Sequence, residues 1–164
     1  MIRIITLNLN GIRSAARKGL LPWLEAQKAD VFCVQEIKAH EADLDASLLA
    51  PAGLKGHFHF AERPGYSGVG VYSRKKPKSV RIGFGDPEFD AEGRYVEADF
   101  GAFTVVSMYL PSGSSSPERQ QAKFRFMKSF AAQLQELMTF FRLAETGRSA
   151  DPARKLCQPP RSPG

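Results

Sequence analysis

Short apolar runs and helical patterns alternate along the first part of the chain. Residues 2–8 are rich in isoleucine and stop at Asn10-Gly11, which predicts a buried strand. Leucine and tryptophan at helical spacing predict a helix over residues 14–27, in which Pro22 marks an early turn or a break. Residues 31–35 predict a second strand. The order strand, helix, strand predicts a right-handed crossover between two parallel neighbours.

The middle of the chain has a different pattern, in which short β-type runs are separated by turn residues. The predicted strands span residues 57–61, 68–73, 79–82, 94–100 and 103–109. Gly101-Ala102 predicts a tight hairpin between the last two. Ser116 followed by Pro117 is typical of a helix start and opens a predicted helix over residues 117–138. These patterns predict an α/β fold with a mixed sheet flanked by helices.

The composition changes at Thr139. The remaining residues contain a brief apolar cluster, then Arg, Ser, Ala, Asp and four prolines, with no strand pattern. We therefore expect two regions, a folded domain over residues 1–138 and a divergent, disordered tail over residues 139–164. The chain has 23 Lys and Arg against 17 Asp and Glu, a net charge of +6, and half of this excess lies in the predicted tail. The charge is compatible with a polyanionic partner but does not identify one.

Length and cysteine content narrow the class of protein. A chain of 164 residues with 43% hydrophobic residues is long enough to bury the core of one domain. Its two cysteines, Cys33 and Cys157, do not make a disulfide scaffold. No run approaches the length of a spanning helix, and the N-terminus has no signal pattern. We expect a reduced, cytoplasmic protein without a membrane partner.

Two polar side chains stand where predicted strands end. Glu36 follows the apolar run of residues 31–34 and Gln35, and Asn8 ends the first strand. The carboxyl ends of neighbouring parallel strands meet at the crevice where open α/β sheets bind ligands. Carboxylate oxygens suit a hard cation such as Mg²⁺, and an amide can orient that carboxylate. The alternatives are a solvated glutamate and a turn-forming asparagine.

A second group of candidate residues combines a tyrosine at a strand end with mainly basic side chains. Tyr109 ends a strand and precedes a Ser- and Gly-rich loop that begins at Pro111 and contains Ser112, and its phenol could donate to a phosphate oxygen. The alternative is an aromatic residue that only closes a hydrophobic strand. Four further residues are candidates for contact with a phosphate backbone, although such side chains are more often merely solvated: Arg13, Lys38, Tyr66 and Arg94.

In order along residues 1 to about 138, five motifs carry a resemblance to a known family. They are Asn8-Leu9-Asn10-Gly11-Ile12-Arg13, Val34-Gln35-Glu36-Ile37-Lys38, Gly65-Tyr66-Ser67-Gly68-Val69-Gly70, Phe89-Asp90-Ala91-Glu92-Gly93-Arg94 and Tyr109-Leu110-Pro111-Ser112-Gly113-Ser114. Together they resemble the exonuclease III / AP endonuclease group of the endonuclease–exonuclease–phosphatase superfamily. A phosphatase or lipid phosphodiesterase of the same superfamily is disfavoured by the Tyr109 and Arg94 motifs.

The resemblance implies a four-layered α/β sandwich and a magnesium-dependent DNA-repair nuclease, with Mn²⁺ as a possible substitute. The implied substrate is double-stranded DNA with abasic sites or 3′ ends. By position Glu36 matches the metal-binding glutamate, Asn8 the active-site amide, and Tyr109 the tyrosine at the scissile phosphate. The residues that match DNA-backbone contacts, or lie beside them in these motifs, are Arg13, Lys38, Tyr66, Arg94 and Ser112.

The chain departs from the family after residue 138. The family mechanism also uses a Gly-Asp-x-Asn motif and a Ser-Asp-His motif, and neither occurs in this sequence. Beyond Asp99 the next aspartate is Asp151, and no histidine follows His59. We therefore expect half a sandwich, with one sheet whose inner face is exposed, and little or no catalysis by this chain. The alternatives are a catalytically dead DNA-binding remnant and a nonfunctional fragment, and a frameshift would explain the abrupt change.

Overall fold

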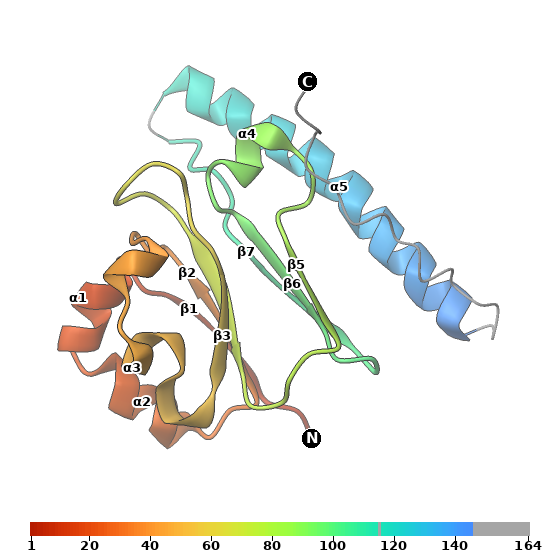
Figure 1. Ribbon diagram of the computed structural model, residues 1–164. Coiled ribbons are helices and arrows are strands. Elements are labelled where there is room, and N and C mark those ends of the chain that lie inside the picture. The colour runs from red at the N-terminus through yellow and green to blue at the C-terminus, as the bar shows by residue number, and fades with distance from the viewer. Residues whose placement is uncertain (115, 146–164) are drawn as a thin grey trace, which may run out of the picture. The chain divides into compact units, whose positions relative to one another are not determined.

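The computed structural model describes residues 1–114 and 116–145, which form two compact units divided between Ser112 and Gly113. The first unit contains two β-sheets and the short helices (Figure 1). Its first sheet is mixed and has the strand order β1-β2-β4-β3. β1 and β2 are parallel, as the sequence predicted, and the other pairs are antiparallel. The strands are β1 (Ile4–Asn8), β2 (Val31–Gln35), β3 (Lys55–His59) and β4 (Val69–Ser73).

The continuous apolar run in β2 reflects burial of this strand on both faces. Phe32 and Val34 pack in a cluster with residues of the short helices, including Ile12 and Leu24. The alternate residues Val31 and Cys33 belong to a second cluster, which faces the other sheet. Because successive side chains of a strand point to opposite faces, a strand buried on both faces has no polar alternation.

The second sheet is antiparallel, with the order β5-β6-β7. Its strands are β5 (Ser79–Ile82), β6 (Tyr95–Asp99) and β7 (Thr104–Met108). The hairpin at Gly101 is confirmed: Phe100 N donates to Phe103 O at 2.9 Å, and Gly101 has a φ of 89°. Val96, Ala98 and Val105 pack against the inner face of the first sheet. The expectation of a single sheet with an exposed inner face is therefore wrong, because the middle strands pair with one another and cover that face.

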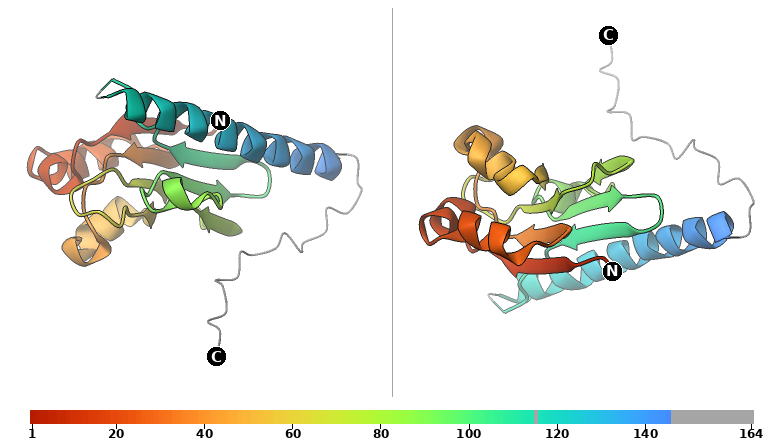
Figure 2. Two further views of the ribbon diagram at one scale, coloured as in Figure 1. Left: turned by 90° about the horizontal axis from the view of Figure 1, so that it is seen from above. Right: turned by 90° about the horizontal axis from the view of Figure 1, so that it is seen from below.

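The predicted helix over residues 14–27 is two helices, α1 (Ile12–Arg17) and α2 (Leu20–Gln27). The break lies at Gly19, which has a left-handed φ of 95°, and Pro22 falls in the first turn of α2, where no helical hydrogen bond is lost. Short helical turns that the sequence did not predict are η1 (Glu41–Asp43), α3 (Ala46–Leu49), η2 (Pro51–Gly53) and α4 (Pro87–Asp90). In the further views α1–α3 stay on the side remote from β5–β7 (Figure 2).

The second unit contains one long helix, α5 (Pro117–Glu145). The predicted cap is present, since Arg119 N donates to Ser116 Oγ at 3.3 Å. The helix continues past the predicted boundary at residue 138, so residues 139–145, which we expected in the tail, are helical. The rest of the predicted tail, residues 146–164, lies outside the described residues. Among the described residues, no helix is both long enough and apolar enough to cross a membrane.

Candidate metal and DNA-binding site

The parallel pairing of β1 and β2 places the two strand-end side chains together. The register aligns Asn8 with Gln35, so Glu36 is the next residue beyond the sheet. Asn8 Nδ2 donates to Glu36 Oε1 at 2.7 Å. Glu36 has a left-handed φ of 54°, and Gly11 N donates to its carbonyl at 2.7 Å. The predicted proximity of the amide and the carboxylate is confirmed.

The Glu36 carboxylate receives hydrogen bonds from both sheets. Tyr109, the residue after β7, donates from its phenol to Glu36 Oε1 at 2.7 Å. Lys38 Nζ lies 2.7 Å from Glu36 Oε2. The hydrogen bond from Asn8, followed by that from Lys38, lowers the pKa of Glu36 to about 2. The carboxylate, whose side chain is 16% exposed, is therefore ionised at neutral pH and partly open to solvent.

Tyr109 stays protonated at this site. Burial, followed by the hydrogen bond to Glu36, raises the pKa of Tyr109 to about 12. A neutral phenol has an O–H to donate, whereas a phenolate is only an acceptor. Tyr109 can therefore donate either to Glu36, as it does here, or to another oxygen that enters the site.

Lys38 connects the carboxylate with the turn after β1. Its ammonium donates to Asn10 Oδ1 at 2.6 Å, and Asn10 N in turn donates to Asn8 Oδ1 at 3.0 Å. Both Lys38 and Asn10 have left-handed φ values, 50° and 46°. The two loops lie side by side, since Ile12 N also donates to the carbonyl of Ile37 at 2.9 Å. The residue types of Glu36 and Lys38 do not predict a left-handed backbone.

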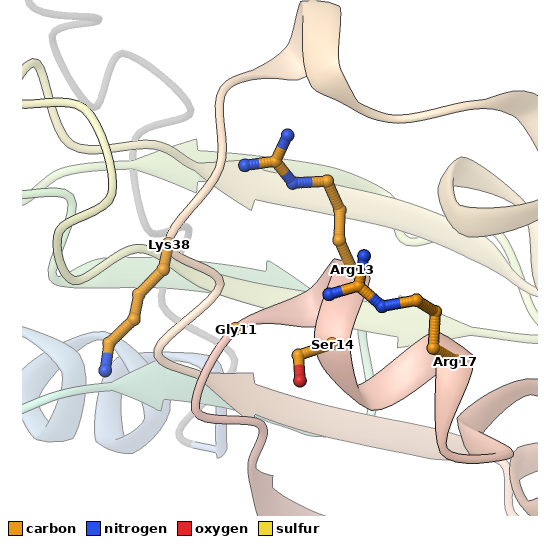
Figure 3. A pocket seen from close by; sticks show the side chains of 5 residues that line it. All are labelled: Gly11, Arg13, Ser14, Arg17 and Lys38. Atoms are coloured by element: carbon orange, nitrogen blue, oxygen red, sulfur yellow. The ribbon is translucent and has the colours of Figure 1, made fainter.

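Asn8, Glu36 and Tyr109 form what we call the strand-end site. A pocket of about 400 Å³ next to Lys38 is lined by three cations (Figure 3). Arg13 and Arg17 come from α1, and Lys38 comes from the connection after β2. Gly11 and Ser14 complete the lining. Arg13 and Lys38 were predicted from the sequence, whereas Arg17 was not. The i, i+4 spacing of Arg13 and Arg17 on one helix face is the signal that could have found it.

Arg13 and Ser112 are accessible, as contact with a large ligand requires. The Arg13 side chain is 55% exposed and pairs with Asp43 at 3.5 Å. Ser112 is exposed in the loop after Tyr109. The structure brings Lys38 and Arg13 to one pocket and leaves Ser112 outside its lining. Their contact with DNA stays a prediction.

Arg94 and Tyr66 lie differently from the other basic and aromatic candidates. The Arg94 side chain is only 1% exposed, and its Nη2 donates to Tyr66 Oη at 3.0 Å. Its Nη1 donates to the carbonyl of Tyr109 at 2.8 Å, and its Nε contacts Glu92. The structure thus joins these two candidates to Tyr109 through the protein interior.

The chain belongs to the Endonuclease/Exonuclease/phosphatase family, whose model matches residues 5–139. This match covers all but the first four residues of the first unit and most of α5, and it includes every candidate site residue. It agrees with the resemblance seen in the sequence motifs and with the two-sheet α/β architecture.

Its relatives include repair nucleases. The chain is 31% identical over 137 residues to an exodeoxyribonuclease of Bacillus subtilis, covering 83% of this chain and 53% of the relative. It is 30% identical over 141 residues to exodeoxyribonuclease III of Haemophilus influenzae, covering 84% and 51%. The solved structure of an AP endonuclease from Archaeoglobus fulgidus matches with a TM-score of 0.72 and 27% identity, covering 83% of this chain and 52% of that one. The chain therefore spans about half the length of these relatives.

Proposed function

We propose that this chain forms the metal-binding and DNA-binding part of a magnesium-dependent repair nuclease of the AP endonuclease and exonuclease III kind. Its substrate would be double-stranded DNA with abasic sites or 3′ ends, in the cytoplasm. The observation that carries the proposal is the Glu36 carboxylate, which stays ionised between Asn8, Lys38 and Tyr109 at the strand ends. The cationic pocket beside it supports contact with a phosphate backbone.

The oxygen ligands available at and beside the strand-end site fit magnesium. Glu36 supplies a carboxylate, and Asn8 and Asn10 supply amide oxygens. Mg²⁺ prefers oxygen ligands and commonly takes one or two carboxylates, with water and substrate phosphate completing its shell. Mn²⁺ accepts the same donors. Among the described residues, no group of three or more His, Cys, Asp or Glu side chains could hold a metal ion, and Glu36 is the one carboxylate of the proposed donor set.

When bound, the metal would polarise a phosphoryl oxygen. The chain's own residues would position the carboxylate and the phosphate. Asn8 holds Glu36 Oε1 in place, and Tyr109 offers a neutral O–H that can turn from Glu36 to a phosphate oxygen. Lys38 and Arg13 would bind the backbone electrostatically.

We further propose that this chain alone binds DNA with little or no incision. A water-activating base and a group that stabilises charge on the phosphate are needed for hydrolysis. The motifs that supply them in the family, Gly-Asp-x-Asn and Ser-Asp-His, are absent from this sequence. A DNA-binding protein without catalysis is therefore the second candidate function, favoured by the same cationic pocket.

An incision and binding assay tests these proposals. The purified chain would be incubated with a duplex that carries one abasic site, with Mg²⁺ or with EDTA, beside the Glu36→Ala variant. We expect salt-sensitive binding and at most weak incision that disappears with EDTA and with Glu36→Ala. Strong EDTA-sensitive incision would overturn the proposed inactivity. Absence of any duplex binding at low salt by a chain that melts cooperatively would overturn the proposed function.

Replacing Lys38 by methionine should separate metal binding from DNA binding. The ammonium 2.7 Å from Glu36 Oε2 repels an incoming cation, and unit charges about 4 Å apart interact by about 1 kcal/mol even in water. We therefore expect Mn²⁺, followed by electron paramagnetic resonance, to bind Lys38→Met at least about fivefold more tightly. Duplex binding should weaken, and its salt dependence should fall by about one counterion.

Lys76→Met is the matched control, since Lys76 is an exposed lysine in the connection after β4. It should leave Mn²⁺ binding unchanged. Weaker Mn²⁺ binding by Lys38→Met would contradict this account and show that the ammonium is needed to hold the carboxylate.

A further inference from the structure

Arg94 lies beside Tyr109, the residue of the strand-end site that follows β7 of the second sheet. Arg94 precedes β6 and Tyr109 follows β7, and the register pairs the adjacent residues Tyr95 and Met108. Tyr109 N donates to the carbonyl of Arg94 at 3.1 Å, and Arg94 Nη1 donates to the carbonyl of Tyr109 at 2.8 Å. The main chain of Tyr109 is thus held on both sides by one residue.

The same guanidinium lies between two aromatic rings. Its central carbon is 5.3 Å from the ring centroid of Tyr109 and 5.7 Å from that of Tyr66. Arg94 Nη2 also donates to the Tyr66 hydroxyl at 3.0 Å. Cation–π contacts of this kind are stronger where the cation is removed from water, as it is for this side chain with 1% exposure.

Glu92 supplies a negative charge for the buried cation, through Arg94 Nε. A buried guanidinium needs both a counter-charge and hydrogen-bond acceptors, and here Glu92, Tyr109 and Tyr66 provide them. Because the side chain is 1% exposed, a phosphate could reach it only if neighbouring groups moved away. The planar fork also fixes the directions of the three bonds, which a lysine ammonium would not do.

We propose that Arg94 is a positioning residue, which fixes the Tyr109 phenol against Glu36 and couples it to Tyr66, and that it does not itself contact DNA. The importance of this coupling for a metal site rests on the proposed function, but the coupling can be measured without metal or DNA. Failure of the nuclease assay would therefore leave this proposal open to its own test.

The test uses nuclear magnetic resonance of the chain labelled at tyrosine Cζ and at the glutamate carboxyl carbon. Tyr109→Phe and Tyr66→Phe assign the two tyrosine signals. In Arg94→Lys, which keeps the charge, we expect both signals to move. The Glu36 carboxyl signal should move in the same direction as in Tyr109→Phe, because the phenol is no longer held against the carboxylate.

A double-mutant cycle distinguishes positioning from general destabilisation. If Arg94 acts through Tyr109, Arg94→Lys should cause no further movement of the Glu36 carboxyl signal once Tyr109→Phe is present. Arg74→Lys is the control, because Arg74 also donates to main-chain carbonyls, those of Ala29 and Ala52, in the same unit. It should leave the Tyr66, Tyr109 and Glu36 signals unchanged.

Three results would overturn the proposal. The first is an Arg94→Lys variant whose Tyr109 and Glu36 signals match those of the unmodified chain. The second is weaker duplex binding by Arg94→Lys while the tyrosine signals stay in place, which would indicate direct DNA contact. If Arg94→Lys does not fold, Tyr66→Phe decides, since it removes the acceptor of Nη2 and keeps the ring. An unmoved Tyr109 signal in that variant is the third result.

Discussion

Replacing Glu36 by glutamine is expected to weaken Mn²⁺ and Mg²⁺ binding at least about tenfold, the loss seen when even an outer-shell partner of a metal site is removed. Glutamine keeps the shape of the side chain but removes the charge, and Glu36 supplies the carboxylate of the proposed donor set. Electron paramagnetic resonance of Mn²⁺ measures the free ion directly, and competition with Mg²⁺ gives the second affinity.

The matched control is Glu25→Gln, an exposed glutamate on α2 away from the strand ends. It should bind Mn²⁺ as the unmodified chain does. Equal Mn²⁺ affinity in Glu36→Gln and Glu25→Gln would exclude Glu36 as the ligand, whatever the incision assay shows.

Glu36→Gln should also change how the free energy of unfolding depends on pH. The pKa of Glu36 is lowered in the folded chain from 4.5 to about 2, so the folded state favours the ionised form. This contribution to the free energy of unfolding is fully present above pH 4.5 and is lost as the pH falls toward 2. The melting temperature of the unmodified chain, relative to that of Glu36→Gln, should therefore fall between these pH values.

Replacing Gly93 by alanine should destabilise the first unit by about 3 kcal/mol, the sum of a left-handed backbone penalty and an overpacked contact. Gly93 has a φ of 63°, and an added Cβ would lie 2.5 Å from Ala61 N and 2.6 Å from Phe60 C. These are main-chain atoms, which cannot rotate away. Thermal unfolding should show a melting temperature lower by roughly 6–12 °C.

Gly53→Ala separates the two causes of this loss. Gly53 has a similar φ of 74°, but an added Cβ would meet nothing within 4 Å. We expect it to lose only the backbone part, about 1 kcal/mol. Equal losses in Gly53→Ala and Gly93→Ala would show that the chain does not approach Gly93 as closely as the structure has it.

The pattern of apolar and turn residues along the chain was sufficient to predict most of the strands and the long helix. The apolar run of β2 and the turn residues around Gly101 predicted a strand and a hairpin, and both are present. The buried strand predicted over residues 2–8 is present as β1, but its burial was wrong, because β1 is an edge strand whose residues are all exposed or half-buried. The single helix over residues 14–27 was wrong because the left-handed backbone of Gly19 ends α1 before the apolar pattern stops. The single-sheet expectation was wrong because strand pairing depends on contacts between distant residues, which residue type does not encode locally.

Part of the candidate site could also be predicted from the sequence, and part could not. The sequence placed Asn8 and Glu36 at one edge, since parallel neighbours end together, and the structure confirms this. The motifs also predicted roles for Tyr109 and Arg94. Only the structure shows that the Tyr109 phenol reaches Glu36 from the second sheet, and that Arg94 is buried and donates to the Tyr109 carbonyl.

The sequence by itself determined the family, the order of the strands along the chain and the residue types of the strand-end site, Asn8, Glu36 and Tyr109. Alternation, turn residues and motif spacing are properties of neighbouring positions, so they can be read without coordinates. Only the tertiary structure decided that two sheets close over one core and that their strand ends share one carboxylate. Contacts such as that between Glu36 and Tyr109 join residues far apart in the chain, and packing of the whole unit sets their geometry.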